Sequence, residues 1–359
     1  MNDYSELCKN LVPRQVANTY PRPEGWWRVR VPEIIEDVNA IKKGHVEVVT
    51  HTPGGYPVYC VTYGKKLPQR KVNWSSLTGS KHPEYYTNTA QQTLMFIAGI
   101  HAEETEGIVT LSNFISLMEK GVDHRGIARP HLVELAQNYR IVLMPCVNMD
   151  ARTFAPDCLM GCTQADYAPI QTRLKNGEYL VWPDLKEYFP LPMEEVDQLG
   201  AYYNFDGVNI QLDSSPGNII SNEAKAILRL AHEERIDCFV NMHTATYGAH
   251  FVHPTIINYP GNYRTVHAIN RIWSDKIGRV LDYGEEAYSV QCDINDAVSL
   301  ATGAVTMTYE AAGLKVEPFE NKLEVAYQMM ETIMEMGLER PLAPRDTIMK
   351  RIDGYKVNN

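Results

Sequence analysis

The stretch 93–107 constrains the fold more than any other part of the chain. Its first half, up to residue 100, is a continuous apolar run, which is typical of a strand buried on both faces of a parallel sheet. Its second half places His101, Glu103, Glu104 and Glu106 within six residues. Three carboxylates beside an imidazole repel one another, so a bound cation is the simplest explanation of this cluster.

His101 and Glu104 stand three residues apart where the chain is expected to turn from strand into helix, so both side chains can converge on one metal ion. Zinc sites with two His and one Glu leave a fourth position open for water, which is a catalytic arrangement. A lone His-x-x-Glu is nevertheless a weak signal, because two common residues at this spacing occur by chance in most long chains.

Composition restricts the class of protein. The 359 residues suffice for about two domains, although a large α/β fold can hold such a length in one. Lys and Arg number 34 against 44 Asp and Glu, and no basic cluster is long enough to follow a phosphate backbone, so we do not expect a nucleic acid partner. Without a signal peptide or an apolar run of about 18 residues, we expect a cytoplasmic protein with no membrane partner.

Seven cysteines, an odd number, are scattered along the chain. This pattern predicts reduced and mostly buried thiols. Cys158 and Cys162 are four residues apart, but no second Cys or His pair with ribbon spacing lies near them, so a structural zinc site is the weaker interpretation.

The N-terminal part, residues 1–44, is interpreted as an arm followed by a short helix. Up to about residue 30 the chain is polar and contains the adjacent Trp26 and Trp27, and we expect it to be extended and packed on the outside. Apolar residues then recur at helical intervals over 31–43. Residues 45–63 contain two β-rich runs around a Pro-Gly-Gly turn, which predicts a hairpin.

Strands and helices alternate in the rest of the chain, which indicates a doubly wound sheet. Further apolar runs predict strands over residues 140–147, 238–242 and 304–309. Periodic segments predict helices over residues 108–120, 131–138, 221–235, 263–280 and 321–338. Methionines in the last helix are interpreted as core packing rather than as a binding surface.

Domain boundaries follow from the same pattern. Residues 45–340 are expected to form a single domain, and 341–359 a charged C-terminal tail. Residues 152–204 lose the periodicity and are too long for a simple connection. We interpret them as a loop insertion that forms a lid or a wall over the site.

The predicted strands end in polar residues, and in open α/β sheets ligands bind outside the carboxyl ends of the strands. These residues are His101 with Glu104, Asn148 with Asp150, His243, and Glu310. Any one of them is most simply a hydrogen-bonded core residue, but four together predict a shared site. A close pair followed much later by His243 is the spacing expected of a catalytic zinc site, and Glu310 then suits a general base acting on water.

Five motifs occur in a characteristic order. They are His-Ala-Glu-Glu at 101–104, Pro-Cys-Val-Asn-Met-Asp at 145–150, Asn-Phe-Asp-Gly-Val-Asn-Ile-Gln at 204–211, Val-Asn-Met-His-Thr at 240–244 and Met-Thr-Tyr-Glu at 307–310. Through them the chain resembles the zinc carboxypeptidase family (M14, the carboxypeptidase A superfamily) over roughly residues 45–338. The resemblance implies a mixed, mainly eight-stranded twisted sheet with helices on both faces and a site at the strand ends.

The resemblance also implies roles for individual residues. His101, Glu104 and His243 are similar to the ligands of one Zn²⁺ ion. Glu310 is similar to the glutamate that activates water and shuttles its proton. Tyr288 stands at the spacing of the substrate-capping tyrosine of the family, with a loop tyrosine packed on the rim as the alternative.

An arginine of the family polarises the scissile carbonyl, and Arg152 and Arg173 are both candidates for this role. The sequence does not choose between them, and each is also compatible with an ordinary surface arginine.

One motif departs from the family. Where ordinary members carry Gly-Val-Asp-Leu-Asn-Arg, whose Asn-Arg pair binds the C-terminal carboxylate of the substrate, this chain has Gly-Val-Asn-Ile-Gln-Leu at 207–212. Asn209 and Gln211 remain candidates for substrate binding, but Leu212 cannot pair with a carboxylate. Simple C-terminal exopeptidase activity is therefore in doubt. Either another cation such as Arg173 or Lys175 replaces the arginine, or the substrate lacks that carboxylate.

These observations predict a zinc-dependent hydrolase of an amide or peptide bond, acting on a peptide or a small acylated amino acid. Two alternatives remain open: an aspartoacylase-like deacylase, and a catalytically silent pseudoenzyme that binds peptide. A nucleotide-binding sheet is set aside because no Gly-x-Gly-x-x-Gly follows a strand and no Gly-Lys-Ser or Gly-Lys-Thr occurs. The sequence carries no indication of the oligomeric state.

Overall fold

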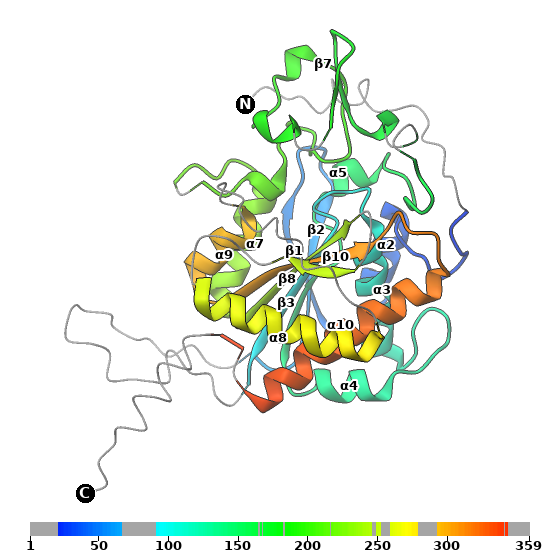
Figure 1. Cartoon of the computed structure of the whole chain (residues 1–359), viewed down its shortest axis with the longest axis vertical. Coiled ribbons are helices and arrows are strands. Elements are labelled where there is room, and N and C mark those ends of the chain that lie inside the picture. The colour runs from blue at the N-terminus through cyan, green and yellow to red at the C-terminus, as the bar shows by residue number, and fades with distance from the viewer. Residues whose placement is uncertain are drawn as a thin grey trace, which may run out of the picture.

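A twisted mixed sheet forms the centre of the molecule, with helices on both faces (Figure 1). The computed structural model describes residues 21–66, 91–163, 166, 168–181, 184–215, 217–245, 249–252, 259–278, 293–340 and 342–343. Within them the sheet has seven strands in the order β1-β2-β4-β3-β8-β10-β9. These are β1 (His45–His51), β2 (Pro57–Tyr63), β3 (Thr93–Ala98), β4 (Arg140–Met144), β8 (Cys238–Ala245), β9 (His250–Val252) and β10 (Val305–Ala312).

The four inner strands β4, β3, β8 and β10 run parallel, and antiparallel strands lie at both sides of them. β1 and β2 form the predicted hairpin on one side, and β9 pairs with β10 on the other. The mixed α/β architecture expected from the sequence is therefore confirmed. The described residues contribute seven strands to the main sheet, close to the eight expected. Parallel strands place their carboxyl ends at one edge, and the polar strand ends of the sequence meet there.

More helices cover one face of the main sheet than the other. On one face lie α2 (Val31–Asn39), α3 (Thr105–Lys120), α4 (Pro130–Ala136), α8 (Tyr259–Ile277) and α10 (Phe319–Glu339). On the other lie α7 (Asn222–Glu234) and α9 (Ile294–Thr302), which contact each other. A short helix, α5 (Met149–Arg152), follows β4. The remaining helical turns are η3 (Ala168–Ile170), η4 (Asp184–Glu187), η5 (Met193–Glu195) and η6 (Ile210–Leu212).

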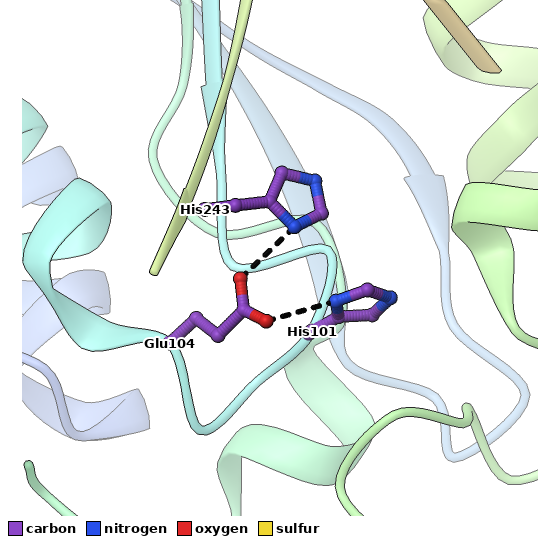
Figure 2. A group of neighbouring side chains, drawn as sticks. All are labelled: His101, Glu104 and His243. Atoms are coloured by element: carbon purple, nitrogen blue, oxygen red, sulfur yellow. Dashed lines mark hydrogen bonds and ion pairs between the residues drawn. The ribbon is translucent and has the colours of Figure 1, made fainter. Parts of the chain in front are cut away.

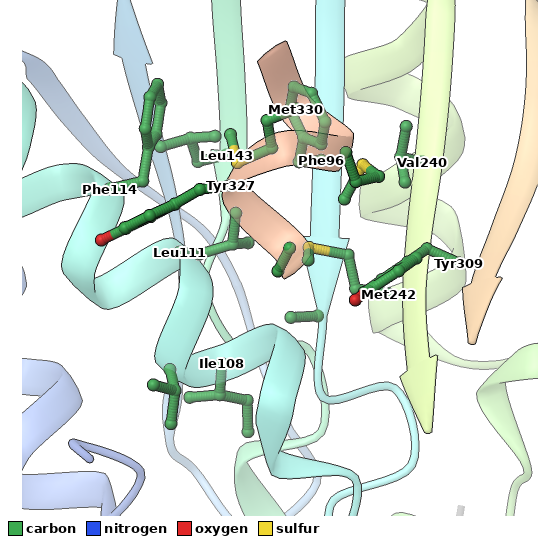
Figure 3. Packing of buried hydrophobic residues seen from close by; sticks show 14 of the residues in the cluster. Phe96, Ile108, Leu111, Phe114, Leu143, Val240, Met242, Tyr309, Tyr327 and Met330 are labelled. Atoms are coloured by element: carbon green, nitrogen blue, oxygen red, sulfur yellow. The ribbon is translucent and has the colours of Figure 1, made fainter. Parts of the chain in front are cut away.

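Strand β3 shows why the apolar run of the sequence is buried on both sides. All six of its residues are buried. Leu94 and Phe96 pack in the larger core under α3 and α10, where Figure 3 shows Phe96. Met95 and Ile97 pack in the smaller core under α7. Alternation of side chains along a strand sends successive residues to opposite faces, so a sheet covered on both faces requires a continuous apolar sequence.

Helix α3 is pressed closely against the sheet at its first turn. A Cβ atom on Gly107 would lie 2.7 Å from the Cβ of Met242 and 3.0 Å from that of Ala98, so only glycine allows this approach. The helix ends at Gly121, whose φ of 79° is left-handed and whose N–H donates to the carbonyl of Leu117. This packing fixes the turn between β3 and α3.

The N-terminal tryptophans are an exception to the sequence expectation. Trp26 and Trp27 are buried in the larger core, and the Trp27 ring meets Phe319 edge to face with centroids 4.6 Å apart. The Trp27 indole N–H donates to the carbonyl of Asp157 at 2.9 Å. The expectation of an arm packed on the outside was wrong for these residues, because a non-periodic segment gives no local signal of what it packs against.

The expected loop over residues 152–204 contains regular structure. A small sheet in the order β6-β5-β7 is formed by β5 (Thr172–Leu174), β6 (Tyr179–Leu180) and β7 (Val196–Gln198), and it lies at the top of Figure 1. We call the described residues from 168 to 205 the insertion lobe. It has an apolar cluster of its own, including Leu185, Leu191 and Tyr203.

Two further expectations concern thiols and membranes. The described cysteines are free thiols, and all but Cys162 are buried. Among the described residues, none of the helices is both long enough and apolar enough to cross a lipid bilayer.

Candidate metal centre

Three predicted ligands come from the carboxyl ends of neighbouring parallel strands. His101 lies in the turn after β3, and Glu104 occupies the N-cap position of α3. His243 lies within β8, which pairs with β3 in parallel. Strand β8 continues beyond the predicted end at Met242 because its ladder with β10 continues through His243.

The side chains of these three residues converge (Figure 2). The Glu104 Oε1 atom lies 3.0 Å from His101 Nδ1, and its Oε2 atom lies 2.9 Å from His243 Nδ1. The two imidazole rings meet edge to face with centroids 4.8 Å apart. We call His101, Glu104 and His243 the metal triad.

The metal triad fits a zinc ion by its chemistry and its geometry. One donor atom from each residue lies within 4.8 Å of the others, and all three side chains are buried. Two imidazoles and a carboxylate are a common zinc donor set, and donors bound at about 2.0–2.1 Å in a tetrahedral arrangement lie roughly 3.3 Å apart. The buried Nε2 atom of His243 has no hydrogen-bond partner, so Nδ1 is its engaged atom.

Burial and mutual attraction determine the protonation of the metal triad. Burial disfavours the charged form of Glu104, but His243 and His101 outweigh it and hold the pKa of Glu104 at about 2. Burial also lowers the pKa of His101. The pKa of His243 is raised to about 9, because Glu104, Glu310 and Asp293 together outweigh the effect of burial. An anionic environment of this kind favours a cation between the side chains.

Asn209 contacts the other side of His101. Its Oδ1 atom lies 3.3 Å from His101 Nε2 and also accepts the backbone N–H of Gln211. With a proton on Nε2 donated to this oxygen, the lone pair of Nδ1 is available for a cation bound between His101 and Glu104. The ring of Tyr202 packs against His101 with centroids 4.2 Å apart, so the insertion lobe closes one side of the site.

The neighbouring carboxylates of the motif do not belong to the metal triad. Glu106 Oε2 accepts the Thr244 hydroxyl at 2.8 Å, and its Oε1 lies 3.8 Å from the buried Lys322 ammonium. Glu103 is fully buried, and its charge acts on Arg152. Of the three carboxylates at 103–106, only that of Glu104 is directed at the imidazoles.

Glu310 lies beside the metal triad on the next strand. It is the residue of β10 paired with His243 in the parallel ladder, and side chains paired in this way project to the same face. Burial raises the pKa of Glu310 to about 7, with an opposing effect of His243 and a reinforcing effect of Glu104. A carboxyl group that titrates near neutrality can both accept and return a proton.

Gln211 is fixed by a polar network that the sequence analysis did not identify. Its Oε1 atom accepts from Asn241 Nδ2 at 2.7 Å, and its Nε2 atom donates to Asp293 Oδ2 at 2.9 Å. Burial, followed by the charge of Asp296, raises the pKa of Asp293 to about 6. Two signals could have indicated this network: Asn241 alternates with His243 along β8, and Asp293 with Asp296 forms a capping box at the start of α9.

The two candidate arginines occupy different environments. Arg152 is 3% exposed and donates to the backbone carbonyls of Ala102, Ala155 and Pro156. Arg173 lies in β5 of the insertion lobe and pairs with Asp197 at the surface. Neither set of contacts directs a guanidinium at the metal triad, so the assignment of a carbonyl-polarising arginine stays a prediction.

Lys175 was a candidate to replace the missing arginine, and Tyr288 was the candidate substrate-capping tyrosine. Lys175 donates to the carbonyl of Glu194 in the insertion lobe. Tyr288 lies outside the described residues.

Comparison with known proteins agrees with this geometry. The model of the family described as zinc carboxypeptidase matches residues 44–340, which is most of the chain. Comparison with curated protein sequences gives no match.

Solved structures of carboxypeptidases resemble the fold at low sequence identity. A metallo-carboxypeptidase from Burkholderia cenocepacia is 12% identical with a TM-score of 0.51, over 84% of this chain and 66% of its own. A Pseudomonas aeruginosa metallo-carboxypeptidase in complex with (2-guanidinoethylmercapto)succinic acid is 11% identical with a TM-score of 0.53, over 85% and 67%. Bovine thrombin-activatable fibrinolysis inhibitor, in complex with tick carboxypeptidase inhibitor, is 12% identical with a TM-score of 0.50, over 86% and 94%.

This chain thus spans just under two thirds of the Burkholderia structure, and the likeness concerns the fold. The family match covers the five ordered motifs and the metal triad. The chain belongs to the zinc carboxypeptidase family.

Proposed function

We propose that the chain is a zinc-dependent hydrolase that cleaves an amide or peptide bond in a carboxypeptidase-like way, within a single domain over residues 45–340. The observation that carries this proposal is the convergence of His101, Glu104 and His243 within 4.8 Å in a buried position beside Glu310. These three residues would hold one Zn²⁺ ion. When bound, the ion supplies Lewis-acid chemistry, which lowers the pKa of water and polarises a carbonyl group.

Glu310 has the role of general base and acid in this proposal. Its carboxylate removes a proton from the attacking water, and it returns that proton to the nitrogen of the leaving amine when the bond breaks. Asn209 holds His101 in the tautomer that presents Nδ1. Tyr202 covers the imidazole and restricts the entry of bulk water from that side.

Gln211 and its partners indicate which substrates suit the site. The amide of Gln211 is held between the neutral Asn241 and the carboxyl group of Asp293. Hydrogen-bond partners of this kind do not favour an anionic substrate group next to Gln211. A substrate whose leaving part lacks a free carboxylate is therefore a second candidate, beside a peptide or a small acylated amino acid with its carboxylate bound by a cation elsewhere.

Metal analysis combined with hydrolysis assays tests the proposal. Purified wild-type protein is expected to contain about one zinc per chain and to hydrolyse at least one member of a panel of peptide, N-acyl amino acid and ester substrates. Glu310→Gln should keep the zinc and lose the hydrolysis. Zinc without hydrolysis across the whole panel would identify the silent peptide-binding alternative, and absence of both would reject the enzyme.

Matched substrates separate the two modes of cleavage. The same peptide is supplied with a free C-terminal carboxylate and as the C-terminal amide. A strong preference for the free acid supports the carboxypeptidase-like mode. Equal turnover, or preference for the amide, rejects it in favour of a substrate without that carboxylate.

A further inference from the structure

Thr244 joins two carboxylates of the 103–106 cluster, only one of which belongs to the metal triad. Its backbone N–H donates to Glu104 Oε2 at 3.0 Å, and its hydroxyl donates to Glu106 Oε2 at 2.8 Å. Glu104 occupies the N-cap position of α3, and Glu106 lies in the first turn of that helix. Thr244 of β8, which follows His243, therefore fastens the start of α3 at two points.

The backbone bond to Glu104 follows from the unequal lengths of the two ladders of β8. Strand β3 pairs with β8 as far as Met242, whereas β10 pairs with it through Ala245. The Thr244 N–H thus lies beyond the end of the ladder with β3, and the carboxylate of Glu104 accepts it in place of a strand carbonyl. The same oxygen faces His243 Nδ1 at 2.9 Å (Figure 2). The orientation of this carboxylate therefore depends on the position of Thr244.

Gly313 limits the space around the Thr244 side chain. A Cβ atom at Gly313 would overlap Cγ2 of Thr244 and would lie 3.3 Å from Glu106 Oε2. The backbone after β10 thus packs directly against the threonine, and a larger residue at this position would displace it. Close packing and the bond to Glu106 together hold the hydroxyl in place.

Glu106 is paired with Lys322 in the first turns of α10. The two residues are 3% and 5% exposed, and Glu106 Oε1 lies 3.8 Å from the Lys322 Nζ atom. The ammonium group also donates to the carbonyl of Ala312, the last residue of β10, and to that of Gly313 at 3.1 Å. A buried carboxylate is costly without a partner of opposite charge, and Lys322 supplies one. Glu106 therefore has a fixed position from which it accepts the Thr244 hydroxyl.

We propose that Lys322, Glu106 and Thr244 form a positioning chain behind the metal triad. Lys322 holds Glu106, Glu106 holds the Thr244 hydroxyl, and the Thr244 N–H holds the carboxylate of the metal triad in the orientation that suits a zinc ion. Partners of this kind orient metal ligands, and their removal typically lowers metal affinity by about 10- to 100-fold. The inference rests on the proposed function, because it concerns the affinity of the same zinc site.

Thr244→Val and Thr244→Ser separate the hydroxyl from the shape of the side chain. Valine keeps the shape without the hydroxyl, serine keeps the hydroxyl, and both keep the backbone N–H. Competition with a chromophoric chelator gives the zinc dissociation constant of each full-length protein, and circular dichroism shows that it is folded. Thr244→Val should bind zinc about tenfold or more weakly than the wild type, and Thr244→Ser should stay within about threefold of it.

Cobalt provides a readout of the metal site that does not depend on activity. The visible absorption of protein loaded with Co²⁺ reports the coordination geometry, so it should change in Thr244→Val and remain that of the wild type in Thr244→Ser. Thr62→Val is the matched control. Thr62 is a buried threonine of β2, which β4 and β3 separate from β8, and its hydroxyl has no hydrogen-bond partner among the described residues. This control should keep the affinity and the spectrum of the wild type.

Glu106→Gln tests the next link of the positioning chain. It removes the charge that pairs with Lys322 and should also weaken zinc binding. Because Glu106 acts through the Thr244 hydroxyl, the double variant Thr244→Val/Glu106→Gln should lose clearly less affinity than the product of the two single losses. If Glu106→Gln does not fold, the comparison of Thr244→Val with Thr244→Ser decides the question.

Three results would overturn the inference. They are wild-type zinc affinity in Thr244→Val, an equal loss in Thr244→Ser or in Thr62→Val, and single losses that multiply in the double variant. A wild type that binds no zinc would reject this inference together with the proposed function. Zinc binding and hydrolysis that are unaffected by Thr244→Val would reject this inference alone.

Discussion

Glu310 and His243 lie directly opposite each other in the parallel pair formed by β10 and β8. Val240 and Met242 of β8 point into the larger core (Figure 3). Because side chains alternate along a strand, His243 projects to the opposite face, and its ladder partner Glu310 projects with it. The expected base and one expected ligand are therefore positioned by the backbone ladder itself rather than by a mobile loop. A site built on adjacent strands holds its groups accurately.

Replacing Glu310 by Gln should lower kcat by about 10²- to 10⁴-fold, since the amide cannot accept a proton from water. Zinc content should remain at the wild-type value, because Glu310 is not part of the metal triad. Steady-state kinetics on any substrate found in the panel, together with metal analysis, measures both effects. Glu320→Gln, the same change at an exposed position in the first turn of α10, serves as the control. Full activity of Glu310→Gln would remove Glu310 from the reaction.

Replacing His243 by Ala should abolish stoichiometric zinc binding, because two donors remain of three. Zinc bound only by the folded protein stabilises it by about 4 kcal/mol when its free concentration is 1,000 times Kd. Added zinc should therefore raise the unfolding temperature of the wild type but not that of the variant, as measured by calorimetry.

The exposed His131, which pairs with Glu335, provides the control His131→Ala. A zinc response that survives His243→Ala would show that the ion binds elsewhere.

Glu223 should make the protein less stable as the pH rises. Burial, reinforced by Asp150 and Asp206 and opposed by hydrogen bonds that include Asn204, raises its pKa from 4.5 to about 8. Between these values the folded protein binds more protons than the unfolded chain, so the free energy of unfolding falls with increasing pH. Glu223→Gln keeps the shape without the charge and should be more stable than the wild type by about 2–4 kcal/mol at pH 8.

Near pH 4.5 the two proteins should be equally stable. Chemical denaturation at both pH values, with the exposed Glu194→Gln as control, measures the difference. A stability difference that does not depend on pH would show that the carboxyl group of Glu223 is not the cause.

Asp150 should contribute to stability through three donors. Its carboxylate accepts from the Thr52 hydroxyl at 2.5 Å and from the backbone N–H groups of Gly54 and Phe205, each at 3.0 Å. Asp150→Asn puts an NH₂ group in place of one acceptor oxygen, and it should lower the free energy of unfolding by about 1–3 kcal/mol. Urea denaturation measures this loss, with the exposed Asp275→Asn as control. An unchanged free energy of unfolding would mean that the segments around Gly54 and Phe205 are held in place by other contacts.

Elements with a strong local pattern were predictable from the sequence. Helices α3, α7 and α10 lie within a few residues of their predicted bounds, because an amphipathic stripe is repeated over several turns. Local capping residues reinforce two of these ends: the side chain of Ser221 accepts from Ala224 N, and Gly121 is left-handed. The apolar run of β3 predicted a strand buried on both faces.

Other features depend on contacts between distant residues and were not predictable. Strands of two or three residues, as in the insertion lobe, are too short to show a period. Burial of Trp27 depends on Phe319 and Asp157, which are far away in the chain. Helix α9 has nine residues and was also missed.

The residues of the site likewise divide into those with a local sequence signal and those whose position depends on distant contacts. The structure brings His101, Glu104 and His243 together because parallel neighbouring strands share an edge, and strand-end polarity indicated this. The choice between Arg152 and Arg173 had no such basis, because the direction of a long side chain depends on its tertiary partners.

The insertion lobe keeps an apolar cluster separate from the two cores of the sheet. It touches the site through Tyr202 and through the bond from the Ala102 N–H to the Ala201 carbonyl at 3.1 Å. The residues of this cluster are distinct from those that pack on the strands of the main sheet. The shape of the rim beside the imidazoles is therefore set largely by packing inside the lobe, whereas the positions of the metal triad are set by the strands of the main sheet.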